Sequence, residues 1–261
     1  YMLQIIVELI KLASLIITLT KSLACAGRVA AVLEQQPSMT DGTQTLSGDS
    51  EEAVSFQNVT FTYAGAGAPS LMDINFQAKK GQTIGIIGGT GSGKSTLVNL
   101  IPRFYDPQEG TVRLNGGDVK QLSRAALCAR VGVVQQRAVL FQGSIRDNLR
   151  WGNENASDAE LWEALSAAQA KEVVEGKPGQ LDFQLEQGGR NLSGGQKQRL
   201  SIARALVKKP EILILDDSSS ALDYATDLKL RQAIKALPGD MTVFIVSQRA
   251  SSLMHADQII V

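Results

Sequence analysis

The period of the hydrophobic pattern changes several times along the chain, and each change predicts a different element. Apolar residues alternate with polar ones from Val54 to Tyr63, with room for a bulge, and again from Leu71 to Phe76, as in half-buried strands. Asn115-Gly116 predicts the turn of a hairpin over 111–118. Short continuous apolar runs predict buried strands at 83–87, 131–134, 212–215 and 243–246.

Helical patterns separate the buried strands. They predict a helix that continues to Arg103, and further helices over 194–207 and 225–237. The stretch 144–186 is polar and helical, most clearly at 159–170. Because strands alternate with helices, the sequence predicts an α/β domain with a mainly parallel sheet flanked by helices. The early strands form an antiparallel side sheet, and 144–186 an inserted α-helical subdomain.

The two ends of the chain have patterns of their own. Tyr1–Leu23 is largely apolar, and its charged residues are Glu8, Lys11 and Lys21. A membrane span needs about 20 mostly apolar residues. The residues alone therefore leave two interpretations open, an amphipathic soluble helix or part of a membrane helix with a polar face. The helix lacks an N-cap and the chain ends within an apolar strand pattern, so we expect both ends to be cuts in a longer protein.

Composition narrows the function classes. Apolar residues make up 44% of the 261 residues and charged residues 20%, which is enough to form a sizeable core. The 26 basic and 26 acidic residues balance, so the chain lacks the raised basic charge typical of nucleic-acid binders. Two cysteines, Cys25 and Cys128, cannot form a disulfide scaffold and indicate a reducing compartment.

The segment Gly88–Ser95 reads GGTGSGKS and fits the phosphate-binding loop of P-loop NTPases. It follows a predicted strand and opens a predicted helix, so backbone N–H groups and the helix dipole can hold phosphates. We expect Lys94 to reach the β- and γ-phosphates and the Ser95 hydroxyl to ligate Mg²⁺. The other nucleotide-binding candidates here are Gly88, Gly89, Thr90, Gly91, Ser92, Gly93 and Thr96.

Two further motifs follow. The apolar strand at 212–215 ends in Asp216, which we expect to hold the metal through a water molecule, opposite Ser95. LSGGQ at 192–196 places a candidate N-cap and two glycines at the start of a predicted helix. This helix N-terminus is the second one in the chain, after that of the phosphate loop, that is suited to binding an anion. One nucleotide does not need both termini if they lie far apart. We therefore expect the second to serve a nucleotide held by another subunit, through Ser193, Gly194, Gly195 and Gln196.

The phosphate loop, LSGGQ and ILILDD, in this order, closely resemble the ATP-binding cassette (ABC) family. The resemblance covers Val54–Val261 and implies ATP and Mg²⁺ as cofactors. It implies that Tyr63 stacks on adenine and that Gln136 contacts Mg²⁺ and links to the transport domain. It also implies that the loop SSALD, which is Ser219–Asp223, crosses to a partner's nucleotide site and brings Asp223 there.

The stretch VLFQGSIRDNL at 139–149 resembles the exporters of this family, although Gln187 stands where they usually carry a carboxylate. In exporters the last membrane helix leads into this domain. The resemblance thus implies that 1–33 is the cytoplasmic end of that helix, 34–50 a linker and 51–261 the nucleotide-binding domain, with its helical subdomain at about 137–207. It implies a membrane domain belonging to the same protein, a place at the cell membrane with this domain on the cytoplasmic side, and no nucleic-acid partner.

Two positions depart from the family pattern. Asp217 stands where the family has a glutamate as general base, and the missing methylene retracts its carboxylate by about 1 Å, a misplacement that can cost about 10²-fold in rate. Gln248 stands where the family has a switch histidine that contacts the γ-phosphate. The one histidine of the chain, His255, lies further on and is expected at the surface.

Since LSGGQ is intact, the combination resembles the degenerate half of heterodimeric exporters. It implies an ATPase whose own site, with Lys94, Gln136, Asp217 and Gln248, hydrolyses ATP weakly. The LSGGQ of this chain would complete the competent site of a second half-transporter subunit. Four alternatives stay open: a homodimer with two slow sites, a chain that tolerates Asp217 and Gln248, a soluble cassette ATPase acting on DNA or ribosomes, and an ATP-gated regulatory or channel subunit.

Overall fold

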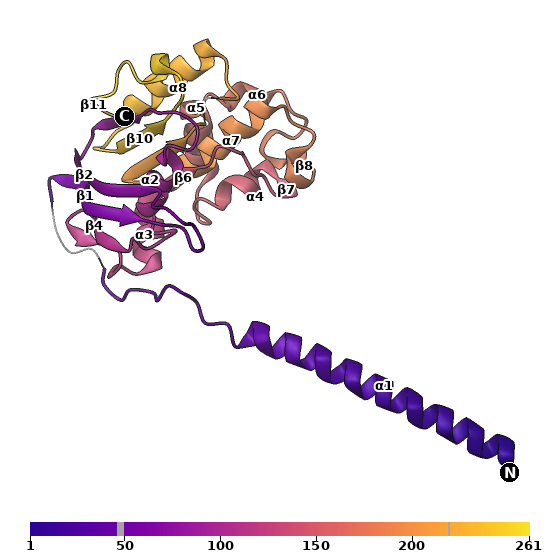
Figure 1. Cartoon of the computed structure of the whole chain (residues 1–261). Coiled ribbons are helices and arrows are strands. Elements are labelled where there is room, and N and C mark those ends of the chain that lie inside the picture. Colours follow the sequence, from indigo (N-terminus) through magenta and orange to yellow (C-terminus); the bar gives the residue numbers. More distant parts are fainter. Residues whose placement is uncertain (46–49, 219) are drawn as a thin grey trace. The chain divides into compact units, whose positions relative to one another are not determined.

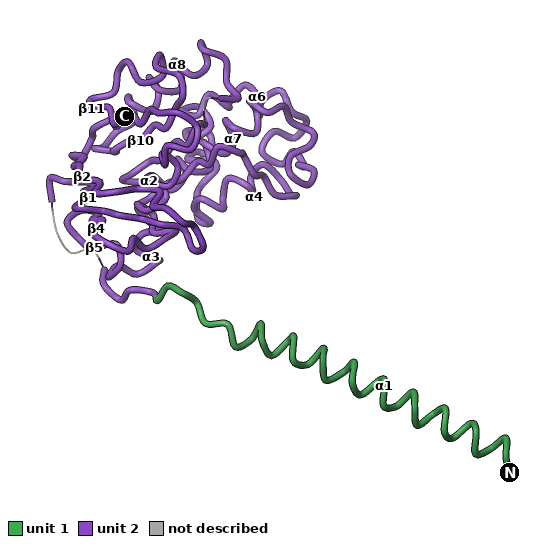
Figure 2. The backbone as a smooth tube through the Cα atoms, in the orientation of Figure 1, with its two compact units in different colours: residues 1–40 green, residues 41–261 purple. Residues whose placement is uncertain are grey.

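The computed structural model describes residues 1–45, 50–218 and 220–261, and these form two units, 1–40 and 41–261 (Figure 2). The first unit contains one long helix, α1 (Met2–Leu33), whose side chains are all exposed. By length and composition α1 could cross a membrane, in spite of an ion pair between Lys11 and Glu8 on its surface. The bounds of the membrane helix and linker expected from the sequence stay predictions.

A parallel sheet forms the centre of the second unit, and among the described residues its strand order is β11-β3-β10-β9-β6. Its strands are β3 (Thr83–Ile86), β6 (Val131–Val134), β9 (Ile212–Asp216), β10 (Thr242–Val246) and β11 (Gln258–Ile260). All of their pairings are parallel, so the predicted mainly parallel sheet is confirmed.

An antiparallel side sheet has the order β2-β1-β4-β5 and consists of β1 (Glu52–Phe61), β2 (Leu71–Lys79), β4 (Glu109–Leu114) and β5 (Gly117–Asp118). The pairing of β1 is irregular around Asn58, as the bulge prediction required. The predicted hairpin is also confirmed, since Asn115 and Gly116 have φ values of 47° and 82°, which a tight hairpin turn needs.

The alternation of side chains along the buried strands explains why their sequences are continuously apolar. Ile212 and Ile214 of β9 join a core cluster with β1, β2 and β4, whereas Leu213 and Leu215 join a cluster with the helical segment. Successive side chains of a strand point to opposite faces. The parallel sheet is therefore covered on both faces, as parallel sheets usually are.

Helices α2 (Lys94–Leu100) and α3 (Arg124–Arg130) lie on the side-sheet half of the domain (Figure 1). The prediction that the first helix continues to Arg103 was wrong. Pro102 has no backbone N–H to continue the helical hydrogen bonds. Arg103 then turns into the left-handed region, with φ of 56°, and its Nε donates to Asp106 Oδ1 at 2.7 Å.

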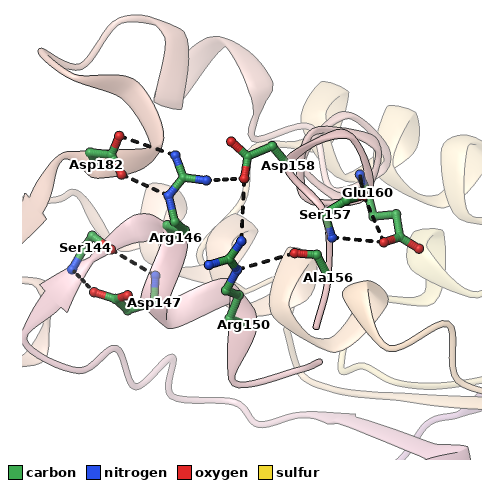
Figure 3. Close-up of polar contacts among 9 residues, drawn as sticks. All are labelled: Ser144, Arg146, Asp147, Arg150, Ala156, Ser157, Asp158, Glu160 and Asp182. Atoms are coloured by element: carbon green, nitrogen blue, oxygen red, sulfur yellow. Dashed lines mark hydrogen bonds and ion pairs between the residues drawn. The ribbon is translucent and has the colours of Figure 1, made fainter. Parts of the chain in front are cut away.

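The inserted helical segment is present as several short elements. They are β7 (Gly143–Ser144), α4 (Ile145–Arg150), α5 (Asp158–Ala167), α6 (Lys171–Glu175), β8 (Gln184–Leu185) and 3₁₀ turns at Gln180–Asp182 and Gln187–Gly189. Helix α5 ends before the predicted residue 170, because Gln169 adopts a φ of 55°. Figure 3 shows the polar contacts that join these elements: the guanidinium of Arg146 on α4 donates hydrogen bonds to both Asp158 and Asp182.

Two longer helices complete the domain. Helix α7 (Gly194–Val207) has the predicted bounds, and α8 (Tyr224–Lys235) begins and ends close to them. A further 3₁₀ turn, Ala250–Ser252, follows β10. Arg231 Nη2 on α8 lies 2.7 Å from Asp227 Oδ2, both side chains are nearly buried, and the Ser252 hydroxyl donates to the same carboxylate. This ion pair therefore fastens the turn to α8.

We predict that Asp227→Ala lowers the free energy of unfolding by about 3–5 kcal/mol, because it leaves the Arg231 guanidinium buried without its counter-charge. Urea denaturation of the chain measures the change. Glu175→Ala is the matched control: it breaks the Lys171–Glu175 pair, whose side chains are 52% and 48% exposed, and should cost less than about 1 kcal/mol. An equal decrease in the free energy of unfolding in the two variants would show that burial does not make the Asp227–Arg231 pair more stabilising than an exposed pair.

Candidate functional site

The loop over 88–95 joins the end of β3 to the start of α2, and its glycines are required by geometry. Gly91 and Gly93 have φ values of 83° and 90°, a region that side chains disfavour. A Cβ on Gly88 would lie 2.6 Å from Ser92 Oγ, and one on Gly93 would lie 2.8 Å from the carbonyl oxygen of Ser70. The tight curl of this loop therefore depends on glycine at these positions.

The Lys94 ammonium lies against the inside of this loop. Its Nζ donates to the carbonyl oxygens of Gly88, at 2.9 Å, and Gly89, at 2.6 Å, and lies 3.4 Å from Ser92 Oγ. The chain's own carbonyl groups thus hold the cation at the mouth of the loop. An anion seated on the loop would meet this charge at once.

Strand register brings the second motif to the loop. Across the sheet, Val246 of β10 pairs with both Ile86 of β3 and Asp216 of β9, so the three strands end at one level. The Ser95 hydroxyl donates to Asp216 Oδ1 at 3.0 Å. Burial raises the pKa of Asp216, with a smaller contribution from the neighbouring Asp217, while the bond from Ser95 opposes the shift. A cation placed here would relieve that penalty.

Asp217 is held in an unusual backbone conformation beside this pair. Its φ is 43°, and its N–H donates to the carbonyl oxygen of Val246 at 3.0 Å. The carbonyl oxygen of Asp217 accepts a hydrogen bond from Ser220 Oγ. Gln136 Nε2 donates to Asp217 Oδ2 at 3.0 Å. The structure therefore brings together Ser95, Asp216, Asp217 and Gln136. Gln248 follows the end of β10 and is exposed.

The N-terminus of α7 is built by a capping box. Ser193 Oγ accepts from the N–H of Gln196, and Gln196 Oε1 accepts from the N–H of Ser193. A Cβ on Gly194 would meet nothing within 4 Å, whereas one on Gly195 would lie 3.1 Å from the carbonyl oxygen of Ala221. The first turn of α7 carries no acidic residue. Its positive end is open to an anion from outside the helix.

Tyr63 and Asp223 have contacts that the sequence did not predict. The Tyr63 hydroxyl lies 3.0 Å from Thr96 Oγ1, and its ring packs edge-to-face with Phe61 and Tyr105. The Asp223 carboxylate caps α8 by accepting from the N–H of Thr226, which lowers its pKa. Ser219, the first residue of the predicted SSALD loop, lies outside the described residues.

The oxygen ligands at this site fit Mg²⁺. The ion prefers hard oxygen ligands and keeps waters or phosphate oxygens in its shell. The Ser95 hydroxyl and the desolvated Asp216 carboxylate supply two such ligands, and the Gln136 amide lies next to them through Asp217. In the described part of the chain, no three His, Cys, Asp or Glu residues gather into a metal site. An ion held by Ser95 and Asp216 would complete its shell with oxygens of water or of a bound ligand.

The sequence did not predict a role for one residue that connects α7 to the loop that carries Gln136. Gln198 of α7 is 2% exposed, and its Nε2 donates to the carbonyl oxygen of Gln135 at 3.3 Å. It belongs to no loop motif. Its one signal in the sequence is its place four residues after Gly194 and four residues before the apolar Ile202, on one face of the helix.

Comparison with known proteins decides the family. The pattern of the family described as ABC transporter matches residues 71–220, which is more than half of the chain. The chain belongs to the ABC transporter family. An uncharacterized ABC transporter ATP-binding protein of Mycobacterium tuberculosis is 40% identical over 266 residues, covering 100% of this chain and 45% of that protein.

Two other similar proteins are exporters by name. The β-(1→2)glucan export ATP-binding/permease protein NdvA of Rhodopseudomonas palustris is 42% identical over 231 residues, covering 88% of this chain and 38% of NdvA. The structure of a bacterial Atm1-family ABC exporter with ATP bound superposes with a TM-score of 0.86 at 32% identity, over 93% of this chain and 43% of that one. The ABC chain described here thus has the exporter-type nucleotide-binding fold, and it spans less than half the length of these relatives.

We predict that Lys94→Ala weakens MgATP binding to the chain by about 10- to 100-fold, because hydrogen bonds to charged groups contribute about 1.5–3 kcal/mol each. Titration with a fluorescent ATP analogue measures the affinity. Lys229→Ala, which removes an exposed lysine of α8, is the control and should bind normally. Unchanged affinity in Lys94→Ala would show that the loop does not hold the phosphates.

Proposed function

We propose that the chain is the ATP-binding and ATP-hydrolysing part of an ABC exporter, coupling nucleotide turnover to transport across a membrane. The observation that carries this proposal is the meeting, at one edge of the parallel sheet, of the glycine loop, the Ser95–Asp216 pair and the Gln136–Asp217 pair. Phosphoryl transfer depends mostly on positioning and on electrostatic stabilisation, and this arrangement offers both.

Each group has a distinct role in the proposed site. The backbone of 88–95 and Lys94 bind the β- and γ-phosphates, and the Tyr63 ring supports the base. Ser95 and Asp216 hold Mg²⁺, with Gln136 beside them, and the ion neutralises charge on the phosphates when bound. Asp217 is the carboxylate nearest in sequence to this pair and is the candidate to orient the attacking water. The amide of Gln136, at 3.0 Å, holds one of its oxygens.

The contacts of Asp217 favour a site that is poor at hydrolysis. Its short side chain is already tied to Gln136, and its backbone is fixed at both N–H and carbonyl oxygen. The carboxylate can therefore not extend toward the phosphates by the methylene that a glutamate would have. Gln248 offers an uncharged amide where a histidine would offer a proton. The proposal is thus a half-site that binds ATP and hydrolyses it slowly.

The N-terminus of α7 supports a second half of the proposal. Ser193 and Gly194 are exposed, and no acidic residue compensates the positive end of their helix. Such a terminus stabilises a phosphate brought by another subunit. We infer a heterodimer in which this chain's LSGGQ, with Asp223 nearby, completes the hydrolytic site of a partner half-transporter. A homodimer with two slow sites is the alternative.

The proposal also includes the location of the domain at a membrane. Relatives named as exporters and the apolar length of α1 support a transmembrane domain in the same protein, with α1 at its cytoplasmic end. The domain would then face the cytoplasm at the cell membrane. A soluble cassette ATPase or an ATP-gated regulatory subunit would have the same loop, and export of a substrate by the full-length protein separates these cases.

The half-site assignment gives the sharpest test. Ser193→Ala on this chain should lower ATP hydrolysis by the reconstituted pair about 10²- to 10³-fold, as loss of one well-placed donor does in other enzymes. Asp217→Asn on this chain should change the rate less than about twofold, because its carboxylate serves the slow site. Steady-state phosphate release is the measurement.

Ser157→Ala is the matched control, since Ser157 forms the same kind of capping box with Glu160 at the start of α5. It costs a similar loss of helix stability, about 1 kcal/mol, without any role at a nucleotide. Loss of activity in Asp217→Asn together with a silent Ser193→Ala would invert the assignment and favour the homodimer.

A further inference from the structure

Gln198 connects α7 to the loop that carries Gln136. Its side-chain amide donates to the carbonyl oxygen of Gln135 at 3.3 Å, and that carbonyl shares one rigid peptide group with the N–H of Gln136. Gln198 is 2% exposed, so its amide is buried. A buried polar group is costly unless it is bonded. The bond to Gln135 is therefore the contact that fixes this side chain.

On the other side of the same peptide, the contacts run to the phosphate loop. Gln136 Nε2 donates to Asp217 Oδ2 at 3.0 Å. The adjacent Asp216 accepts from Ser95, the residue that follows Lys94. Three hydrogen bonds, joined by the covalent links 216–217 and 135–136, therefore connect Ser95 to Gln198.

The geometry of α7 carries the change to LSGGQ. Gln198 lies four residues after Gly194, so both lie on one face of the helix, about one turn apart. The capping box at Ser193 and Gln196 ties the first turn to the helix body. A shift of the peptide held by Gln198 would move the first turn with it. Gly195 also packs near Ala221, which offers a second route that does not use Gln198.

We propose that Gln198 is a positioning residue through which nucleotide at this chain's own loop sets the position of the α7 N-terminus. The inference rests on the proposed function, because it assumes that MgATP binds the loop and that LSGGQ serves a second nucleotide. The proposal assigns a role to the slow site. ATP that stays bound at this chain's own loop would position the N-terminus of α7, which acts on the nucleotide of the partner subunit.

Hydrogen exchange of the chain, at a concentration where it is monomeric, tests this without a partner's nucleotide. MgATP should slow exchange in peptides covering 88–97 and should alter it about three- to tenfold in peptides covering 192–200, the effect expected of one neutral hydrogen bond. In Gln198→Met, which keeps the length and removes the donor, the response at 88–97 should remain and that at 192–200 should disappear.

Gln184→Met is the matched control, since Gln184 also donates to a backbone carbonyl, that of Asp182, but on an exposed strand. Its exchange pattern should equal that of the unchanged chain. If Gln198→Met fails to fold, Gln198→Leu removes the donor in a side chain of similar volume without burying a charge.

If MgATP changed hydrogen exchange at 192–200 as much in the folded Gln198 variant as in the unchanged chain, the proposal would be overturned. The contact between Gly195 and Ala221 would then be the connection to consider. No response at 192–200 in the unchanged chain, with 88–97 responding, would overturn it as well. Absence of any response at 88–97 would instead contradict the proposed ATP binding. The two failures are thus distinguishable.

Discussion

The candidate site depends on the register of three neighbouring parallel strands. β3, β10 and β9 end at one level, with Ile86, Val246 and Asp216 in a row across the sheet. Parallel strands present all of their carboxyl ends at one edge, and ligands of open α/β sheets bind there. The glycine loop, the Asp216–Asp217 pair and Gln248 each follow one of these ends. A slip of one residue in β9 would exchange the side chains that enter the two cores and would move Asp216 away from the level of Val246 and Ile86. The two cores on either side of the sheet therefore also fix the site.

Much of this arrangement was predictable, for a physical reason. Glycine loops and continuous apolar strands are local signals, so the sequence located the main strands of the two larger sheets, the hairpin at Asn115-Gly116 and both bounds of α7, but not the two-residue strands β7 and β8. Errors arose where one residue overrode a pattern, as Pro102 did at the end of α2 and Gln169 after α5. Contacts between distant segments had no local signal. The bond from Gln198 to Gln135 joins residues 63 positions apart, and no periodicity could reveal it.

The proposed role of Asp217 depends on the length of its side chain, because its backbone is held in place. Asp217 cannot compensate for its length by a backbone shift, because its N–H is bonded to β10 and its carbonyl oxygen to Ser220. A flexible loop could absorb the difference between Asp and Glu, whereas this loop is held in a left-handed turn. The same bonds that align Asp217 with Gln136 keep its carboxylate back. The order of the site and the short reach that we propose for Asp217 therefore have the same geometric origin.

Comparison of the three capping boxes shows how LSGGQ differs from the other two. In the described chain, α4, α5 and α7 each begin with a serine capping box. The first turns of α4 and α5 carry acidic residues, which compensate the positive end of the helix from within. The third residue of α7 is the neutral Gln196, and glycines precede it. Its cap satisfies the N–H of Gln196 and leaves the charge of the helix end uncompensated. Ser193 and Gln196 together thus stabilise the first turn of α7, while a Cβ on Gly194 would meet nothing within 4 Å, so that the chain itself leaves this end of the helix open.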